Sequence, residues 1–448
     1  MSEKRSVEKT YVVRVFATDA AVRGAMQRAL EDVGVSSDVF HIAENESAAS
    51  KSAGDCLLIA PEGSLPEGIF EAVGSAIEVG GFVGVWSDFD GEVGGAVSDE
   101  WITTELLRQQ GATVSRSLDA LALATMLYPA VRSSKASGVS IQGRANGIVR
   151  RLRQALAECG AEVVGRHCLR LRVDETGRIF APDTDAERQL GEPQTVAEGT
   201  GIVLNARLER KAPENIEALR PDDVTLIAQP PPRLLSEIAS KKLFSAYGMS
   251  LPEEQLCQSP SEASRFVASR SGPSVLKLVK PRLSDKEQQG AVLRDISGAA
   301  AARRATQRLT SLAASMGPPE ALGVLVSKQV DGGVRLWVAM RIHPRFGRLV
   351  LVGVGDVPNG PPLSVFKAPA SVPDVLRVLR DARIGREDNA AEKLAVAVAQ
   401  FSSIIHQLSG RICRAEIHPL VAVLSHSDAL VLDALAEVGP DENAESWF

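Results

Sequence analysis

Several features that would assign this sequence to a particular class of protein are scarce or missing. Five of the 448 residues are cysteine and none of them forms a C-x-x-C pair, which argues against a zinc site and a disulfide framework and fits a reducing cytoplasm. Aromatic residues make up 4% of the chain, and the formal net charge is −6. Nucleic-acid-binding proteins usually carry a basic face. We therefore expect no nucleic-acid partner.

The sequence also lacks targeting and membrane signals. Its start, MSEKRSVEKTYVVRV, carries charges but not the apolar core of a secretory signal peptide. No run of apolar residues approaches the roughly eighteen that a membrane-spanning helix requires. We expect a soluble, cytoplasmic protein with no membrane partner.

What the sequence has is a regular alternation of short apolar runs with amphipathic segments. Over residues 10–132 the order is strand, helix, strand, helix, strand, helix, which predicts a parallel α/β domain of flavodoxin size. The pattern restarts at 137 and ends near 230, which predicts a second, smaller α/β domain. The proline run at 230–232 predicts a linker, because proline fits neither a helix interior nor a central strand. Residues 233–448 follow a different, α+β pattern.

A glycine-containing turn stands at the start of the second α/β segment. In QGRANG, Gly143 and Gly147 lie between an expected strand and an expected helix. Such a turn can present backbone N–H groups and the positive end of a helix to a phosphate. Strand-to-helix turns also contain glycine for conformational reasons alone, so both interpretations stay open.

Two lysines mark the first informative stretch of the C-terminal region. In GPSVLKLVKPRLSDKEQQGAV, at 272–292, Lys277 lies on an expected strand and Lys286 follows a Pro-containing turn. A lysine beside a flexible loop can neutralise the charge of a triphosphate. The alternative is that Lys277 is a solvated strand residue.

Carboxylates and a histidine mark the last informative stretch, ICRAEIHPLVAVLSHSDALVLDA at 412–434. Glu416 and His418 fall on one face of an expected strand by period two, and Asp433 falls on an expected second strand. Carboxylates on adjacent strands outline a Mg²⁺–phosphate site. Solvated strand faces would give the same pattern, and the sequence alone does not separate these alternatives.

Taken in order, these stretches resemble the ATP-grasp domain of ADP-forming acyl-CoA synthetases, the family of the succinyl-CoA synthetase β-subunit. SAYGMSLPEEQLCQSPSEA (245–263) is similar to the family's A-Y-G-I-P-V-P and E-E-A phrases. Residues 273–292 are in register, without a gap, with P-V-V-L-K-I-V-S-P-x-I-x-H-K-S-D-x-G-G-V. Residues 323–355 are similar to the family's Gly-rich hairpin phrase, and RAEIHPL with LDA to E-x-D-x-N-P-L and D-A-R. RQQGATVSRSLDALALATML (108–127) is similar to the end of a CoA-ligase segment.

The resemblance implies a fold and a set of ligands. It implies an α/β protein with two flavodoxin- or Rossmann-like CoA-ligase-type units, at 10–132 and 137–230, and a C-terminal ATP-grasp (α+β) domain at 233–448. It implies ATP, Mg²⁺ or Mn²⁺, CoA and an organic acid as ligands, and a partner subunit that supplies a phosphohistidine.

The same resemblance implies roles for individual residues. Lys277 and Lys286 would contact the ATP phosphates, and Lys286 would lie on a mobile loop that covers them. Asp433, Glu416 and His418 would hold the metal.

The sequence departs from the family at several expected site positions. The family's H-K-S-D is DKEQ at 285–288, the Glu after the hairpin is Arg335, and the Asn before Pro419 is His418. No segment resembles the family's phosphohistidine segment, and no catalytic residue can be named. Two hypotheses follow: an ATP-dependent acid–CoA ligase of the ADP-forming kind, or a component of one; and a degenerate homologue that binds nucleotide or CoA as a regulatory or scaffolding protein.

Overall fold

A computed structural model describes residues 13–17, 19–33, 35, 40–42, 56–60, 69–78, 80–87, 97–134, 138–143, 146–159, 161, 168–176, 178–181, 189–208, 233–280, 283, 286–356, 362–385 and 389–439. The chain divides into two compact units, Met1–Ala212 and Pro213–Phe448. The expected end of the second α/β segment near 230 and the linker expected at 230–232 lie outside the described residues.

The first unit contains a five-stranded parallel sheet with the order β2-β1-β3-β4-β5. Its strands are β1 (Val13–Phe16), β2 (Phe40–Ile42), β3 (Cys56–Ile59), β4 (Phe82–Trp86) and β5 (Thr113–Ser115), and its helices are α1 (Ala20–Asp32), α2 (Ile69–Glu78), α3 (Asp99–Gln109) and α4 (Leu118–Ser134). The parallel pairing confirms the α/β pattern predicted for 10–132. β3 is buried at all four positions, as expected for a strand covered on both faces.

The rest of this unit is a three-stranded sheet, β6-β7-β8, with two helices. Its elements are β6 (Gly138–Gly143), α5 (Asn146–Glu158), β7 (Cys168–Val173), β8 (Ile179–Phe180) and α6 (Pro193–Leu208). One hydrophobic cluster contains Leu58 of the larger sheet, Leu169 of the smaller one, and Leu127 of α4. The two sheets therefore share a core, and the domain boundary expected between 132 and 137 stays a prediction.

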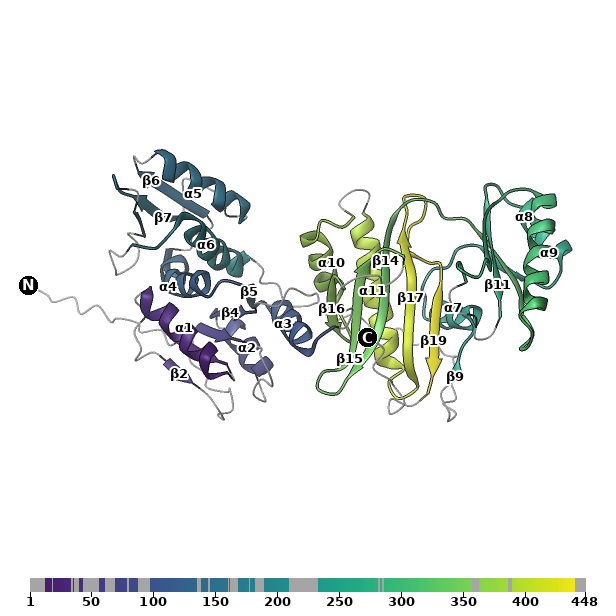
Figure 1. Cartoon of the computed structure of the whole chain (residues 1–448), viewed down its shortest axis with the longest axis horizontal. Helices are drawn as coiled ribbons and strands as arrows, with labels where there is room; N and C mark the ends of the chain where they lie inside the picture. Colours follow the sequence, from purple (N-terminus) through teal and green to yellow (C-terminus); the bar gives the residue numbers. More distant parts are fainter. Residues whose placement is uncertain are drawn as a thin grey trace, which may run out of the picture. The chain divides into compact units, whose positions relative to one another are not determined.

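The second unit begins with a small antiparallel sheet of the order β10-β13-β11-β12. It is built from β10 (Glu254–Cys257), β11 (Ser274–Val279), β12 (Val292–Ile296) and β13 (Gly323–Lys328), with α8 (Pro260–Ala268) and α9 (Ala299–Ser315). Leu276 and Val326 of this sheet share a core with Phe266 and Leu309 of the two helices. Figure 1 shows α8 and α9 together beside β11.

A larger antiparallel sheet, of the order β16-β15-β14-β17-β19-β9, completes the second unit. Its elements are β9 (Arg233–Leu234), α7 (Glu237–Ala246), β14 (Val334–His343), β15 (Gly347–Val354), β16 (Ser364–Lys367), α10 (Val372–Asp381), α11 (Ala390–Gln407), β17 (Ile412–Ala422), β18 (Leu430–Val431), which pairs with β17, and β19 (Ala434–Val438). Leu394, Val398 and Phe401 of α11 pack into its core.

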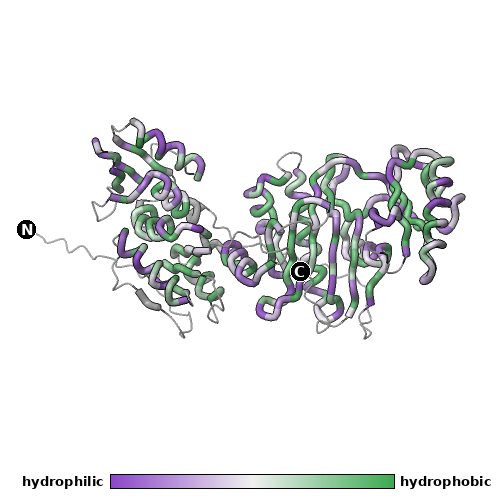
Figure 2. The backbone as a smooth tube through the Cα atoms, in the orientation of Figure 1, coloured by the Kyte–Doolittle hydropathy of each residue, from purple (hydrophilic) through white to green (hydrophobic). Residues whose placement is uncertain are grey.

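The hydrophobic residues of the larger sheet lie on its central strands. β15 is buried at its six inner positions, and Figure 2 shows hydrophobic residues along β14 and β15. No helix in the described part of the chain has the length and apolar character needed to cross a membrane.

Candidate functional site

The first turn of α7 brings two charged residues to the boundary between the two sheets of the second unit. The Ser236 hydroxyl accepts a hydrogen bond from the amide of Ala239 at 3.3 Å and so caps the helix. Glu237 and Lys241 follow at spacing four, which places them on one face of the helix. Their charged atoms lie 3.8 Å apart.

Lys277 extends from β11 of the small sheet toward this helix. Its Nζ donates hydrogen bonds to Glu237 Oε1 at 2.9 Å, to the Leu432 carbonyl at 2.9 Å and to Asp433 Oδ2 at 3.1 Å. Burial alone would lower the pKa of Lys277, but the two carboxylates outweigh burial and raise it. The strand position predicted for Lys277 is confirmed. Its ammonium group connects β11 of the small sheet to α7 and to the segment before β19 of the larger sheet.

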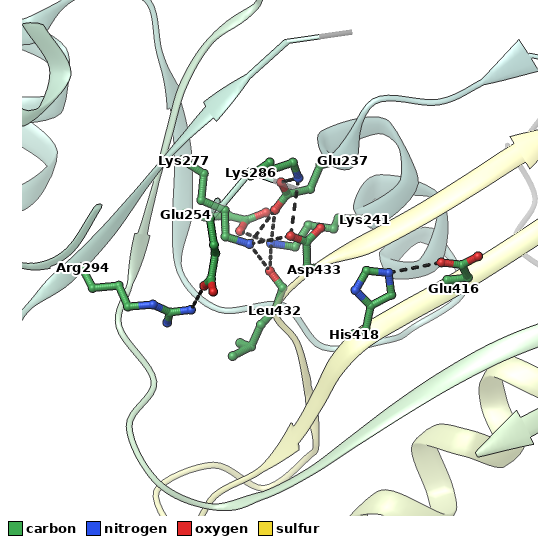
Figure 3. Close-up of polar contacts among 11 residues, drawn as sticks. Glu237, Lys241, Glu254, Lys277, Lys286, Arg294, Glu416, His418, Leu432 and Asp433 are labelled. Carbon is green, nitrogen blue, oxygen red and sulfur yellow. Dashed lines mark hydrogen bonds and ion pairs between the residues drawn. The ribbon is translucent and has the colours of Figure 1, made fainter. Parts of the chain in front are cut away.

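Lys286 reaches the same carboxylates from the turn that precedes β12. Its Nζ donates hydrogen bonds to Glu237 Oε2 and, at 3.4 Å, to Asp433 Oδ2. Lys277 and Lys286 are therefore brought together, as the phosphate-site prediction requires. Figure 3 shows both ammonium groups directed at the same two carboxylates.

Asp433 lies between β18 and β19, whereas the sequence placed it on a strand. Burial alone would raise the pKa of its carboxyl, but Lys277 and Lys286 outweigh burial and lower it to about 2. Asp433 is therefore a carboxylate at neutral pH, held by two ammonium groups.

Lys241 is the most buried of the three lysines, with 1% of its side chain exposed. Its Nζ contacts Glu254 Oε2 at 2.6 Å and the Leu432 carbonyl at 3.0 Å. Lys241 and Lys277 thus share one backbone acceptor. We name Glu237, Lys241, Glu254, Lys277, Lys286 and Asp433 the ion-pair cluster.

Glu416 and His418 form a separate pair on β17. His418 Nε2 lies 3.2 Å from Glu416 Oε2, and Arg414 Nε donates to Glu416 Oε1 at 2.7 Å, so the predicted common face is confirmed. Burial opposes the charged form of both side chains. The hydrogen bond from His418 and the charge of Arg414 outweigh burial and lower the pKa of Glu416. The carboxylates of Glu416 and Asp433 outweigh burial and raise the pKa of His418.

The predicted metal ligands are thus engaged with partners of the protein itself. Asp433 contacts lysines, and Glu416 contacts an arginine and a histidine. Among the described residues, no group of three or more His, Cys, Asp or Glu side chains is placed to hold a metal ion. A metal bound here would need oxygen ligands from another molecule, and the predicted trio of Glu416, His418 and Asp433 stays a prediction.

The raised pKa of His418 predicts a dependence of stability on pH. Because the pKa of His418 is higher in the folded protein than its ordinary value of 6.5, protonation of this histidine stabilises the fold. The stabilisation is present in full below pH 6.5 and is lost as the pH rises through the folded-state pKa. We expect His418→Gln to cost about 1 kcal/mol more near pH 5 than near pH 8. Denaturant unfolding of both proteins across this range measures the difference.

His406→Gln, the same change at an exposed position of α11, is the matched control and should change the free energy of unfolding by no more than about 0.5 kcal/mol. A cost of His418→Gln that stays constant with pH would contradict the prediction.

Gly143 and Gly147, the predicted phosphate turn, lie in the first unit. Gly143 ends β6, and a Cβ there would lie 2.4 Å from the carbonyl oxygen of Val173 on β7, so the close approach of these strands requires glycine. Gly147 lies in the first turn of α5, where a Cβ would meet nothing within 4 Å. The first glycine has a packing reason, and phosphate binding at this turn stays a prediction.

The sequence analysis missed Glu237, Lys241 and Glu254. The available signal was local: Glu237 and Lys241 have the i, i+4 spacing of a helical ion pair just after a capping serine. A surface pair has the same spacing, however, so the spacing predicts neither their burial nor their contacts with β10 and β11.

The ATP-grasp domain family matches residues 228–438. The β subunit of acetate–CoA ligase (ADP-forming) I of Pyrococcus furiosus is 26% identical over 213 residues, which cover 45% of this chain and 90% of that subunit. The 4-hydroxybutyrate–CoA ligase (ADP-forming) of Nitrosopumilus maritimus is 28% identical over 127 residues, so the match spans 18% of that enzyme's length.

Among solved structures, the dinucleotide-forming acetyl-coenzyme A synthetase 1 of Ca. Korarchaeum cryptofilum in complex with coenzyme A and Ca-AMPCP is 23% identical to this chain. The alignment covers 46% of this chain and 93% of that one, with a TM-score of 0.41. By the matches in sequence, residues 228–438 are an ATP-grasp domain of the ADP-forming acyl-CoA synthetase family.

Proposed function

We propose that the second unit binds ATP between its two sheets and that the chain serves an ATP-dependent acid–CoA ligase of the ADP-forming kind, as the enzyme or as one component of it. The supporting observation is that Lys277 and Lys286, from separate segments of an ATP-grasp domain, meet at Asp433. Ammonium groups are point charges suited to phosphate oxygens.

The proposal assigns a role to each group. Lys277 and Lys286 contact phosphates, and Asp433 with Glu416 offers carboxylate oxygens to a Mg²⁺ ion that arrives with the nucleotide. Mg²⁺ is commonly bound by one or two carboxylates together with substrate phosphates and water, so this role does not require a group of three ligands, which the described residues lack. His418 is the weakest part of this set, because imidazole suits softer metals better than Mg²⁺.

CoA and an organic acid are the further ligands proposed for the complete reaction, and the phosphohistidine is proposed to come from a partner subunit. These follow from the names of the relatives: one is the β subunit of an acetate–CoA ligase, and a solved structure of another synthetase contains a phosphorylated phosphohistidine segment. Calorimetry with ATP–Mg²⁺, and then with CoA, tests each ligand separately.

Lys277→Ala is expected to weaken ATP binding by about 1.5–3 kcal/mol, the value of a hydrogen bond to a charged group. In the structure the ammonium of Lys277 contacts two carboxylates, Glu237 and Asp433. The variant should therefore lose some stability too. Titration calorimetry measures the affinity, with circular dichroism to give the folded fraction.

Lys328→Ala, on β13 of the same small sheet and exposed, is the matched control. It should bind ATP like the unchanged protein. Equal ATP affinities of the Lys277→Ala and Lys328→Ala variants would remove Lys277 from the nucleotide site.

The second candidate function is a regulatory or scaffolding protein that binds nucleotide or CoA without turnover. The observation that favours it is that Arg335, at the position where the resemblance expects a glutamate, has its guanidinium on Asp356 at 3.1 Å and on the Val330 carbonyl at 3.0 Å. An arginine in place of a glutamate reverses the sign of the charge at this position of the proposed nucleotide site. Binding of ATP without any CoA-dependent ADP release, even with a complementary subunit, would favour this function.

A further inference from the structure

Glu237 has more lysine partners than any other carboxylate in the ion-pair cluster. Its side chain is 3% exposed and contacts the ammonium groups of Lys277 and Lys286, with Lys241 at 3.8 Å. These lysines come from β11, from the turn before β12 and from α7 itself. The carboxylate of Glu237 thus interacts with ammonium groups from three different segments of the chain.

The ion-pair cluster as a whole is electrically balanced. It contains three lysines and three carboxylates, Glu237, Glu254 and Asp433, which contact them at 2.5–3.8 Å. A phosphate is attracted by net positive charge, and this cluster offers none while all its carboxylates remain in place. Glu237 and Asp433 are the carboxylates that contact Lys277 and Lys286, the two proposed phosphate contacts, so a nucleotide must displace, or be repelled by, one of these two.

The hydrogen bonds of Lys277 lead to the same conclusion. A lysine ammonium has three N–H donors, and Lys277 uses three on Glu237, the Leu432 carbonyl and Asp433. A phosphate oxygen can take a donor from Lys277 only if one acceptor gives it up. Glu237 is an acceptor that it shares with Lys286, and the ammonium of Lys241 lies 3.8 Å from the same carboxylate.

We infer that Glu237 is an internal competitor for phosphate: it occupies the lysines in the nucleotide-free chain and thereby sets the affinity for ATP. This inference rests on the proposed nucleotide site and adds a residue that limits binding there. Its carboxylate holds Lys277 and Lys286 close together and must yield part of that contact when a phosphate arrives.

Glu237→Gln tests the inference, because the amide oxygen can still accept a hydrogen bond from Lys277 while the competing charge is removed. We expect ATP–Mg²⁺ to bind about tenfold more tightly to this variant. The free energy of a tenfold change in affinity is a small part of the interaction energy of two unit charges a few ångströms apart inside a protein. Calorimetry on the full chain measures the dissociation constant.

Glu254→Gln is the matched control. It makes the same charge change in the same cluster and removes a carboxylate from a buried lysine, but within the ion-pair cluster Glu254 contacts Lys241 and neither Lys277 nor Lys286. We expect its ATP affinity to change less than about threefold. Equal affinities in the unchanged protein and Glu237→Gln, or equal tightening in both variants, would overturn the inference.

The unchanged protein supplies a second test that does not depend on how a variant folds. A balanced cluster attracts ATP weakly at a distance, so the dissociation constant should vary by no more than about twofold between low and physiological salt. A steep salt dependence would show net positive charge at the site and would overturn the inference.

The outcomes separate the two proposals. Absence of ATP binding in both the unchanged protein and Glu237→Gln would end the proposed function and the inference together. ATP binding by the unchanged protein with no gain in Glu237→Gln would end the inference alone. Binding seen in Glu237→Gln but not in the unchanged protein would support both.

Discussion

Lys241→Ala is expected to lower the free energy of unfolding of the second unit by about 3–5 kcal/mol, the cost of breaking a buried ion pair from one side. Lys241 is 1% exposed, and its ammonium lies 2.6 Å from Glu254 and 3.0 Å from the Leu432 carbonyl. Its removal leaves Glu254, 13% exposed, without its ammonium partner. It also leaves a space where the lysine stem packed.

Denaturant unfolding of the full chain measures this loss, and hydrogen–deuterium exchange of peptides from 233–439 assigns it to the second unit. Lys242→Ala is the matched control, because it makes the same change at the next residue of α7, which is exposed. Lys242→Ala should stay within about 0.5 kcal/mol of the unchanged protein. A similar small effect of Lys241→Ala would mean that the buried pair contributes little to stability.

Periodicity predicted most of the elements that surround the site. Within the second unit, the lysine-bearing strand expected in 272–292 corresponds to β11, and the strand expected to carry Glu416 and His418 corresponds to β17. These predictions succeeded because hydrophobic spacing is a local property of the sequence. The expected pair of strands at 412–434 is instead β17, β18 and the start of β19, with Asp433 in the break between them.

The pairing of the charges was not predictable in the same way. Lys277 meets Glu237 across 40 residues and Asp433 across 156 residues of sequence, and such contacts depend on how two sheets and a helix pack. A lysine near a flexible loop predicts a phosphate contact, which is why both lysines were expected to bind phosphate. The structure adds that internal carboxylates contact the same ammonium groups.

His418 and Glu416 show the limit of motif reasoning at a metal site. Period two correctly put both side chains on one face of β17. Spacing alone could not show that Arg414 also contacts Glu416, or that lysines contact Asp433. A carboxylate that is paired with a cation in the free protein must exchange that partner for a metal, so metal affinity here depends on the cost of this exchange.

The last prediction concerns turnover. We expect the purified chain alone to make no detectable acyl-CoA from acid, CoA and ATP. Phosphoryl transfer depends on positioning and on metal-assisted stabilisation of charge, and loss of one well-aimed stabilising group costs roughly 10²–10³ in rate. Two of the departures from the family pattern bear on this charge: Arg335, whose guanidinium contacts Asp356, and His418, whose imidazole contacts Glu416.

The two losses together would slow the reaction by about 10⁴ or more, and the sequence contains no segment that resembles a phosphohistidine segment. The assay follows ADP and acyl-CoA with a panel of acids and with Mg²⁺, Mn²⁺ and Zn²⁺ in turn, because imidazole suits the softer ions better than Mg²⁺. Its matched arm adds a CoA-binding subunit with an intact phosphohistidine segment. Turnover in that arm alone would identify this chain as the nucleotide-binding component of a two-part ligase. Rapid CoA-dependent ADP formation by the chain alone would show that Arg335 and His418 belong to a working, divergent active site.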